Sequence, residues 1–194
     1  MKKILIILSL LFCLILPAHS GNIVTFFTPA GTPAGISLWG QSTTPAILSD
    51  TDTTPIELGV KFRSQVGGYI TGIYFYKSSE NTGTHVGNLW TITGTLLSSV
   101  TFTNETASGW QYQALTSPVV IAANTTYIAS YHTNVGRYSA DSAYFASDGF
   151  DNYPLRALAN GEDGGNGVYL YSSSSAFPNQ TYNSANYWVD VNFE

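Results

Sequence analysis

The sequence predicts an all-β fold, an antiparallel β-sandwich of the jelly-roll or immunoglobulin-like type seen in carbohydrate-binding modules. Its composition is the first indication, because only 10% of the 194 residues are charged, while 13 are Tyr and 18 are Gly. Aromatic and β-branched residues favour strands, and Gly and Asn favour turns. Short alternating stretches separated by turn residues are the second indication, and the absence of helical spacing beyond residue 20 is the third. Many short strands joined by turns favour an antiparallel sandwich over a parallel sheet with crossover helices.

Residues 1–20 are predicted to be a secretory signal peptide. Two lysines precede an uncharged, mostly apolar run at 4–16, and Ala18 and Ser20 are the small residues expected at a cleavage site. The run is too short to span a bilayer, which takes about 20 apolar residues. We therefore expect cleavage before Gly21, a secreted or periplasmic protein, and no stable membrane anchor.

Removing this segment changes the chemistry of the remaining chain. Cys13, the single cysteine, is lost with the signal, so no disulfide and no thiol site are expected in the mature protein. Without Lys2 and Lys3, five basic residues stand against twelve acidic ones, a net charge of −7. A chain this acidic is not expected to bind nucleic acid, because phosphate backbones are held by clustered lysine and arginine.

The mature chain has the length of one domain. Residues 21–56 are rich in Pro and Thr and are predicted to form an N-terminal arm with one or two short strands, 21–27 among them. Residues 57–194 are predicted to form the core of the sandwich.

The clearest strand signal is at 57–63, where Leu58, Val60 and Phe62 alternate with polar residues. Such alternation is typical of a strand with one face in the core and one in water. Two glycines then predict a turn, and 69–77 is the next expected strand. Further strands are expected at 89–93, 96–102, 110–115, 119–122, 126–131, 143–145, 168–171 and 187–193.

Two loops concentrate the side chains that a sugar-binding site needs, which are aromatic faces and a few orienting polar groups. If the loops lie at the same end of the sandwich, they form one shared rim. The alternative is structural, because a strand tryptophan commonly packs in the core and a histidine at a strand end commonly fixes a loop. The candidates are Lys77, Asn81, His85, Asn88 and Trp90 in the first loop, and His132, Asn134, Arg137 and Tyr138 in the second.

Two further residues are expected to serve the scaffold. Tyr127 follows a turn and opens a strand, which is typical of a tyrosine that pins a sandwich corner through its hydroxyl group. Asp190 lies between two valines in a predicted strand. It is expected either to face solvent or to be buried and bonded to the backbone or to Lys61 or Arg63.

Glycine-rich loops carry Asp148, Asp151, Glu162 and Asp163, whose oxygens suit a structural calcium ion. The spacing matches no EF-hand, and an ordinary acidic surface loop is the alternative. No other cofactor is expected. The sequence also lacks a nucleophile elbow, a His-Glu-x-x-His zinc motif, a phosphate-binding loop and a dinucleotide fingerprint, so no enzymatic activity is expected.

A series of short motifs, taken in order, resembles the bacterial secreted module known as domain of unknown function 4082. The resemblance covers about residues 39–194 and implies a β-sandwich without an established activity. Such modules usually occur in secreted proteins beside immunoglobulin-like repeats or carbohydrate-active enzymes. The motifs are ELGVKF at 57–62, GIYFY at 72–76, GTHVGNLW at 83–90, SGWQ at 108–111, TTY at 125–127 with SYH at 130–132, FP at 177–178 and NYWVDV at 186–191.

Three functions follow from the sequence. The first is a secreted, non-catalytic module that binds carbohydrate or a cell-surface glycoconjugate. The second is a structural or adhesion module that binds another protein, and the third is a hydrolase whose site no motif reveals.

Overall fold

The computed structural model describes residues 35–194, which form two antiparallel sheets and no α-helix. This confirms the predicted all-β sandwich. The predicted signal peptide and the strand expected at 21–27 lie outside the described residues. Within residues 35–194, no helix is long and apolar enough to cross a membrane.

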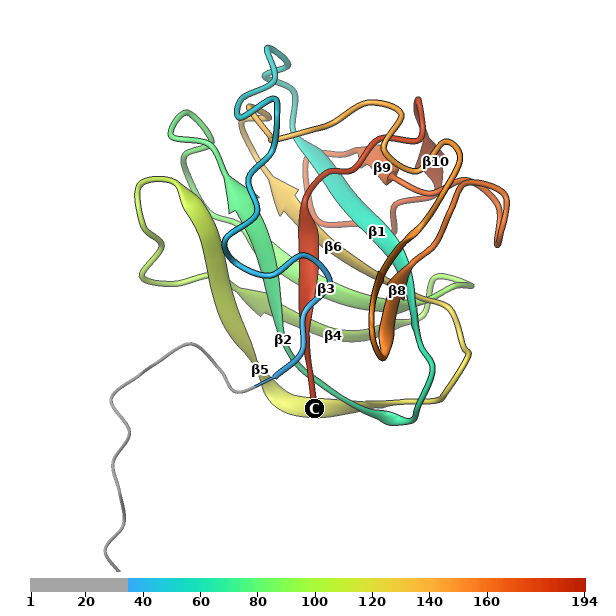
Figure 1. Cartoon of the computed structure of the whole chain (residues 1–194). Coiled ribbons are helices and arrows are strands. Elements are labelled where there is room, and N and C mark those ends of the chain that lie inside the picture. Colours follow the sequence, from blue (N-terminus) through green and yellow to red (C-terminus); the bar gives the residue numbers. More distant parts are fainter. Residues whose placement is uncertain (1–34) are drawn as a thin grey trace, which may run out of the picture. The chain divides into compact units, whose positions relative to one another are not determined.

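The larger sheet has the strand order β10-β9-β1-β6-β3-β4 (Figure 1). β8 pairs with the second half of β1, on the same side as β9, and β7 pairs with β8. The strands are β1 (Ile56–Ser64), β3 (Val86–Thr91), β4 (Leu96–Thr101), β6 (Tyr127–Thr133), β7 (Phe150–Asn152), β8 (Leu155–Ala157), β9 (Val168–Tyr171) and β10 (Gln180–Thr181).

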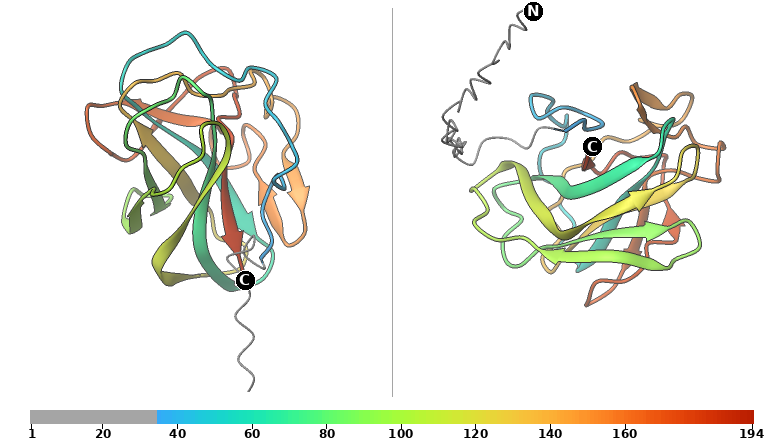
Figure 2. Two further views of the ribbon diagram at one scale, coloured as in Figure 1. Left: turned by 90° about the vertical axis from the view of Figure 1, so that its left-hand side faces the viewer. Right: turned by 90° about the horizontal axis from the view of Figure 1, so that it is seen from below.

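The smaller sheet has the order β11-β2-β5, with β2 (Gly68–Lys77), β5 (Gly109–Ile121) and β11 (Val189–Phe193). Figures 1 and 2 show it lying across one face of the larger sheet, and β2 and β11 contact β1, β3 and β6. The core fills the space between the two sheets.

Alternation places Leu58, Val60 and Phe62 of β1 in this core, each at most 1% exposed. Burying such a side chain contributes about 1.5–3 kcal/mol. From the neighbouring strands, Tyr131 of β6 stacks on Phe75 of β2 with ring centroids 4.3 Å apart. β1, the strand with the clearest period of two, therefore contributes one face to the core.

The outer face of β1 does not lie in water, contrary to the alternation argument. Glu57 points away from the core, yet it is 0% exposed because the segment at 172–178 covers it. Trp90 lies on the same face and packs against Phe177 of this segment, with ring centroids 5.7 Å apart. The larger sheet is thus buried on both faces over part of its area.

Several strand predictions differ from the structure. The strands expected at 110–115 and 119–122 form one strand, β5, whose register with β2 shifts between Ile70 and Gly72. No strand forms at 143–145, where Phe145 packs in the core instead. The short strands β7, β8 and β10 were not predicted, because two or three residues carry no measurable periodicity.

The described part of the N-terminal arm packs on the smaller sheet. The Asp190 carboxylate accepts hydrogen bonds from the N–H groups of Leu38, at 2.6 Å, and Trp39, at 3.0 Å. Asp190 also accepts a hydrogen bond from the N–H group of Val191 and is fully buried. Of the two alternatives for this residue, the structure therefore shows the buried one, with hydrogen bonds to the backbone. Tyr127 serves the corner as expected, because its hydroxyl oxygen accepts a hydrogen bond of 3.1 Å from the N–H group of Ala122.

Candidate functional site

A pocket of about 220 Å³ lies beside β9, at one edge of the larger sheet. It continues the inner face of the sandwich beyond Ile56 of β1, whose partner on β9 is Tyr171. The lining contains five tyrosines and no charged side chain. The lining residues are Ile56, Tyr138, Tyr169, Tyr171, Tyr182 and Tyr187.

The tyrosines form a buried floor and an exposed rim. Tyr138 and Tyr187 are 9% and 6% exposed and meet edge to face, with centroids 5.8 Å apart. Tyr171 and Tyr182 are 50% and 62% exposed. Tyr169 lies two residues before Tyr171 on the same face of β9, at a centroid distance of 5.7 Å. Rim rings are therefore available to a ligand, and floor rings are held by packing.

Two carboxylates border the pocket. The Tyr171 hydroxyl donates a hydrogen bond of 2.6 Å to Asp52 Oδ2. The Asp50 N–H group donates to the carbonyl oxygen of Tyr138, and the Arg137 N–H group donates to that of Asp52, both at 2.7 Å. The segment at 50–52 is thus bound to the turn that carries Tyr138.

The charge of Asp52 follows from these bonds. Although burial disfavours its charged form, hydrogen bonds from Tyr171 and from the backbone of Thr54 lower the pKa of Asp52 below its ordinary value. The same bond to Asp52, together with burial, raises the pKa of Tyr171 to about 12. Asp52 is therefore an anion at neutral pH, and Tyr171 is a neutral hydrogen-bond donor.

A second hollow adjoins the pocket. Tyr171 lines both, and the hollow has a volume of about 330 Å³ and is more open. Its other lining residues are Thr54, Pro55, Ser172 and Ser173. The two hollows share one aromatic ring, which allows a ligand longer than one ring to contact both.

Gly136 fixes the approach of the Asp52 segment. Its φ of 61° is favourable for glycine, and a Cβ atom at this position would lie 2.4 Å from the carbonyl oxygen of Asp52. The turn between β6 and Tyr138 therefore requires glycine for both its conformation and its packing.

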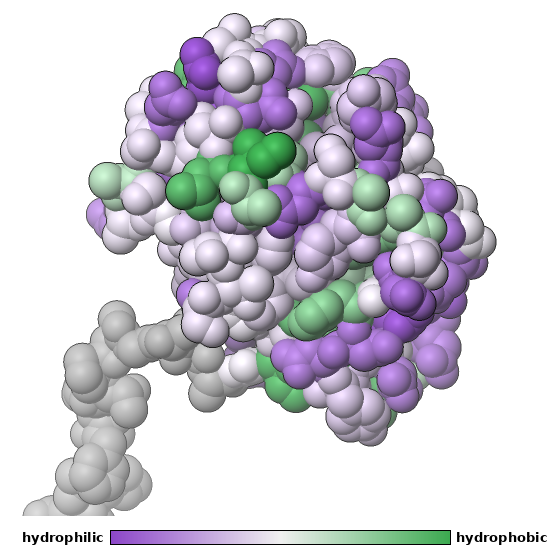
Figure 3. Space-filling model, turned by 45° about the horizontal axis from the view of Figure 1, so that its top comes forward, coloured by the Kyte–Doolittle hydropathy of each residue, from purple (hydrophilic) through white to green (hydrophobic). Residues whose placement is uncertain are grey.

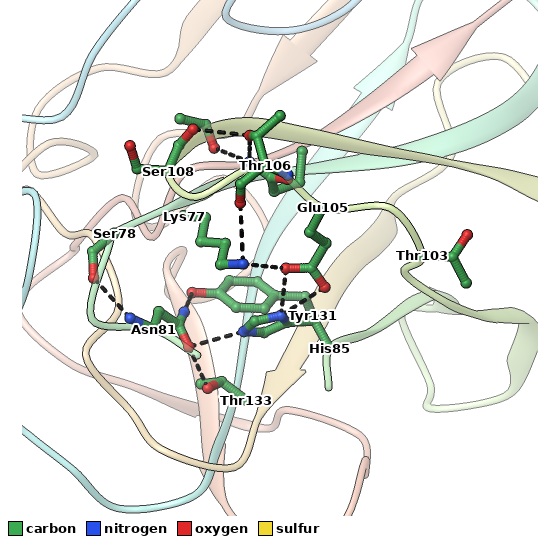
Figure 4. Close-up of polar contacts among 12 residues, drawn as sticks. Lys77, Ser78, Asn81, His85, Thr103, Glu105, Thr106, Ser108, Tyr131 and Thr133 are labelled. Atoms are coloured by element: carbon green, nitrogen blue, oxygen red, sulfur yellow. Dashed lines mark hydrogen bonds and ion pairs between the residues drawn. The ribbon is translucent and has the colours of Figure 1, made fainter. Parts of the chain in front are cut away.

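The first predicted loop forms a buried polar network rather than a rim (Figure 4). Lys77 Nζ lies 2.8 Å from Glu105 Oε2, and His85 Nδ1 lies 2.9 Å from Glu105 Oε1. His85 Nε2 lies 2.9 Å from Asn81 Oδ1, which also accepts a hydrogen bond of 2.6 Å from Thr133 Oγ1. His85 and Asn81 are 0% exposed, and burial lowers the pKa of His85 against the opposing effect of Glu105.

The two histidines do not share a rim. His85 lies between the sheets, where its ring centroid is 4.8 Å from that of Phe75. His132 follows Tyr131, a core residue, so it projects from the opposite face of the sheet. It is 4% exposed, and its Nε2 lies 3.0 Å from the carbonyl oxygen of Ser172. The shared, exposed site inferred from the two loops is not what the structure forms.

Trp90 is also part of the scaffold. It is 7% exposed, and its Nε1–H donates a hydrogen bond of 2.8 Å to Ser130 Oγ. Nearby, Asn88 Nδ2 donates to Glu57 Oε1 at 2.8 Å. Of the remaining candidates, Asn134 is exposed on the turn and Arg137 is half-buried beside the pocket.

Tyr138 is the one sequence-selected residue that lines the pocket. The other four tyrosines were missed, although the density of tyrosine between 169 and 187 was visible in the sequence. Asp52 carried no local signal, because only the folded chain brings it to Tyr171.

The acidic loops are engaged by arginine side chains. Arg156 Nη1 lies 2.6 Å from Asp151 Oδ2, and Arg156 also pairs with Glu162. Arg63 Nη2 lies 3.2 Å from Asp163 Oδ2, and Asp148 is exposed. Among residues 35–194, no group of three or more acidic, His or Cys side chains is arranged to hold a metal ion. Calcium binding at these loops stays a prediction.

Comparison with known proteins gives one match. The family model described as "Domain of unknown function (DUF4082)" matches residues 42–189, which is most of the chain. No curated protein and no solved structure shows a significant match.

Proposed function

The chain belongs to this family of unknown function, and we propose that it is a secreted, non-catalytic module that binds carbohydrate or a cell-surface glycoconjugate. The tyrosine pocket beside β9 carries the proposal. It supplies exposed aromatic rings, phenolic hydroxyl groups and a bordering carboxylate within one hollow. Sugars are recognised by this combination, because their C–H faces stack on aromatic rings while their hydroxyl groups need polar partners.

The dimensions favour a small saccharide. Pockets for drug-sized ligands are about 300–1,000 Å³, so a pocket of about 220 Å³ suits a single sugar ring. The adjoining hollow, which Tyr171 also lines, offers a second ring a mainly apolar contact surface beside Ser172 and Ser173. With two exposed tyrosines as the main contacts, we expect dissociation constants of about 0.1–1 mM, equivalent to about 4–5.5 kcal/mol.

Binding without catalysis is supported by the state of Asp52. A glycosidase needs a carboxylic acid with a raised pKa as proton donor, and a second carboxylate across the scissile bond. The hydrogen bonds of Asp52 lower its pKa instead. His85 and His132 are buried outside the pocket, so neither supplies a general base to a bound sugar.

A broad docking surface for another protein is less well supported. Adhesion through an apolar face requires a contiguous exposed patch of several hundred Å². On the face shown in Figure 3, apolar side chains occupy small separate patches among hydrophilic ones. Exposed apolar residues such as Ile47 and Leu48 occur, at 46% and 52% exposure, and the hollow that Leu48 lines is smaller than the pocket beside β9, at about 130 Å³, with one tyrosine, Tyr76.

Glycan-array screening of the exported protein, followed by calorimetric titration of the best ligand, tests the proposal. Tyr182→Ala should weaken binding about tenfold or more without changing the melting temperature, because Tyr182 is a rim residue. Tyr153→Ala is the matched control, since Tyr153 is 69% exposed and lies outside the pocket. Failure to bind any glycan, or equal losses in the two variants, contradicts the proposal.

A further inference from the structure

Carboxylates border the tyrosine pocket at Asp50 and Asp52. The lining is uncharged, and Asp50 and Asp52 are the charged groups that influence its tyrosines. The nearest basic residue in sequence is Arg137, which contributes its backbone to Asp52 and forms no ion pair with any carboxylate of residues 35–194. The negative faces of the tyrosine rings add to the negative field of the two carboxylates.

We propose that the pocket selects oligosaccharides that carry free, protonated amino groups over their N-acetylated and acidic counterparts. The inference rests on the proposed sugar-binding function and names its substrate class. An ammonium group on a sugar ring stacked at Tyr171 or Tyr182 interacts with the ring faces and with the Asp52 carboxylate. A uronic acid at the same place meets an anion of like charge.

The geometry favours an amino sugar over a simple organic cation. Asp52 Oδ2 is already bound by the Tyr171 hydroxyl, so an incoming ammonium group meets a fixed carboxylate rather than a mobile one. The second hollow, lined by Thr54, Pro55, Ser172 and Ser173, extends beyond Tyr171 and gives a chain of sugar rings a further contact surface that a compact cation does not use. A sugar chain uses both hollows, whereas a quaternary ammonium ion uses only the aromatic rings.

Charge selection predicts a specific dependence on pH and salt. At pH 5.5 sugar amines are protonated and Asp52 remains ionised, because its hydrogen bonds hold its pKa low. At pH 8.5 the amines are neutral, and the preference should disappear. Raising the ionic strength shortens the screening length from about 30 Å at 0.01 M to about 8 Å at 0.15 M, so salt should also reduce it.

The test is calorimetric titration of the exported protein with chitosan tetramer, chitin tetramer, trigalacturonate and choline at pH 5.5, in 10 mM and 300 mM NaCl. We expect chitosan to bind about tenfold more tightly than chitin at low salt, with trigalacturonate and choline weakest. Asp52→Asn keeps an oxygen for the N–H group of Thr54 and an NH2 group that can donate to the Tyr171 hydroxyl, and it should remove the preference while leaving chitin binding in place. Asp148→Asn, at an exposed position away from the pocket, is the control with the same change in net charge.

The outcomes separate the two proposals. If no oligosaccharide binds, the sugar-binding function fails and the inference fails with it. If chitin and chitosan bind equally at low salt, or if Asp148→Asn acts like Asp52→Asn, charge selection at this pocket is wrong while sugar binding stands. Choline binding as tight as that of chitosan would show that the ammonium group alone is recognised, which overturns the assignment to amino sugars.

Discussion

Glu57 offers the sharpest test of the energetics of this fold. It is 0% exposed on the outer face of β1, beneath the segment at 172–178. Ser130 Oγ donates a hydrogen bond of 2.5 Å to Oε1, and the N–H group of Ala176 donates one of 3.3 Å to Oε2. No lysine or arginine of the described chain forms an ion pair with it. Burial therefore dominates and raises the pKa of Glu57 to about 7, against the opposing hydrogen bonds.

The sign of the pH dependence follows directly. Because the folded pKa lies above the unfolded value of 4.5, the native state holds a proton that the unfolded state releases between pH 4.5 and 7. The stability from this group is present below pH 4.5 and is lost as the pH rises through 7. The shift from 4.5 to about 7 corresponds to about 3 kcal/mol, of which about 2.5 kcal/mol falls between pH 5 and 8.

Glu57→Gln removes this titration while keeping the shape of the side chain. Urea unfolding at pH 5.0, 6.5 and 8.0 should show the variant gaining about 2.5 kcal/mol relative to the wild type across the series. Glu80→Gln, at an exposed carboxylate, should run parallel to the wild type. Asp190, with a pKa raised to about 7 by burial, adds the same trend to all three proteins. Parallel profiles for the Glu57→Gln variant and the wild type would refute the reasoning.

Three further substitutions test the scaffold. Lys77→Met should cost about 1.5–3 kcal/mol in urea unfolding, because it removes the lysine from Glu105 and leaves His85 as the side-chain partner of that carboxylate, and a loss below 1 kcal/mol would contradict this. Gly136→Ala should both lower the melting temperature and weaken glycan binding, since the added Cβ atom displaces Asp52. A change in only one of these two quantities would contradict this prediction. Asp190→Ala leaves three backbone N–H groups without a hydrogen-bond acceptor and should raise the rate of proteolysis within residues 35–55. An unchanged rate would show that other contacts hold this segment in place.

The sequence predicted three of the longer strands closely, and in β1 a period of two marks the strand. The expected strands at 57–63, 69–77 and 126–131 correspond to β1, β2 and β6 to within two residues. Local patterns failed where tertiary contacts decide the outcome. The cover over Glu57 comes from a segment more than a hundred residues away, which no alternation in β1 reveals.

The site was predicted less well, for a reason that is also physical. Lys77, Asn81 and His85 were selected as polar groups available to a ligand, yet each makes its hydrogen bonds to other protein groups. A sequence shows which donors and acceptors a loop contains but not which are already satisfied by the fold. The tyrosines show the opposite error. Tyr171 and Tyr182 were not selected as ligand contacts, because their sequence pattern is that of ordinary strand or loop residues, yet both are exposed.

The two sets of residues are nevertheless connected. Ser78, within the buried network, donates a hydrogen bond of 2.7 Å from its Oγ to the carbonyl oxygen of Arg137, and the N–H group of Arg137 donates to that of Asp52. The loop that contains His85 therefore holds the turn that positions Tyr138 and Asp52 at the pocket. Because a binding group needs support from residues behind it to keep its geometry, these polar side chains are best understood as positioning residues. Replacing them should displace the turn and Asp52 with it, and should therefore lower the affinity for the ligand.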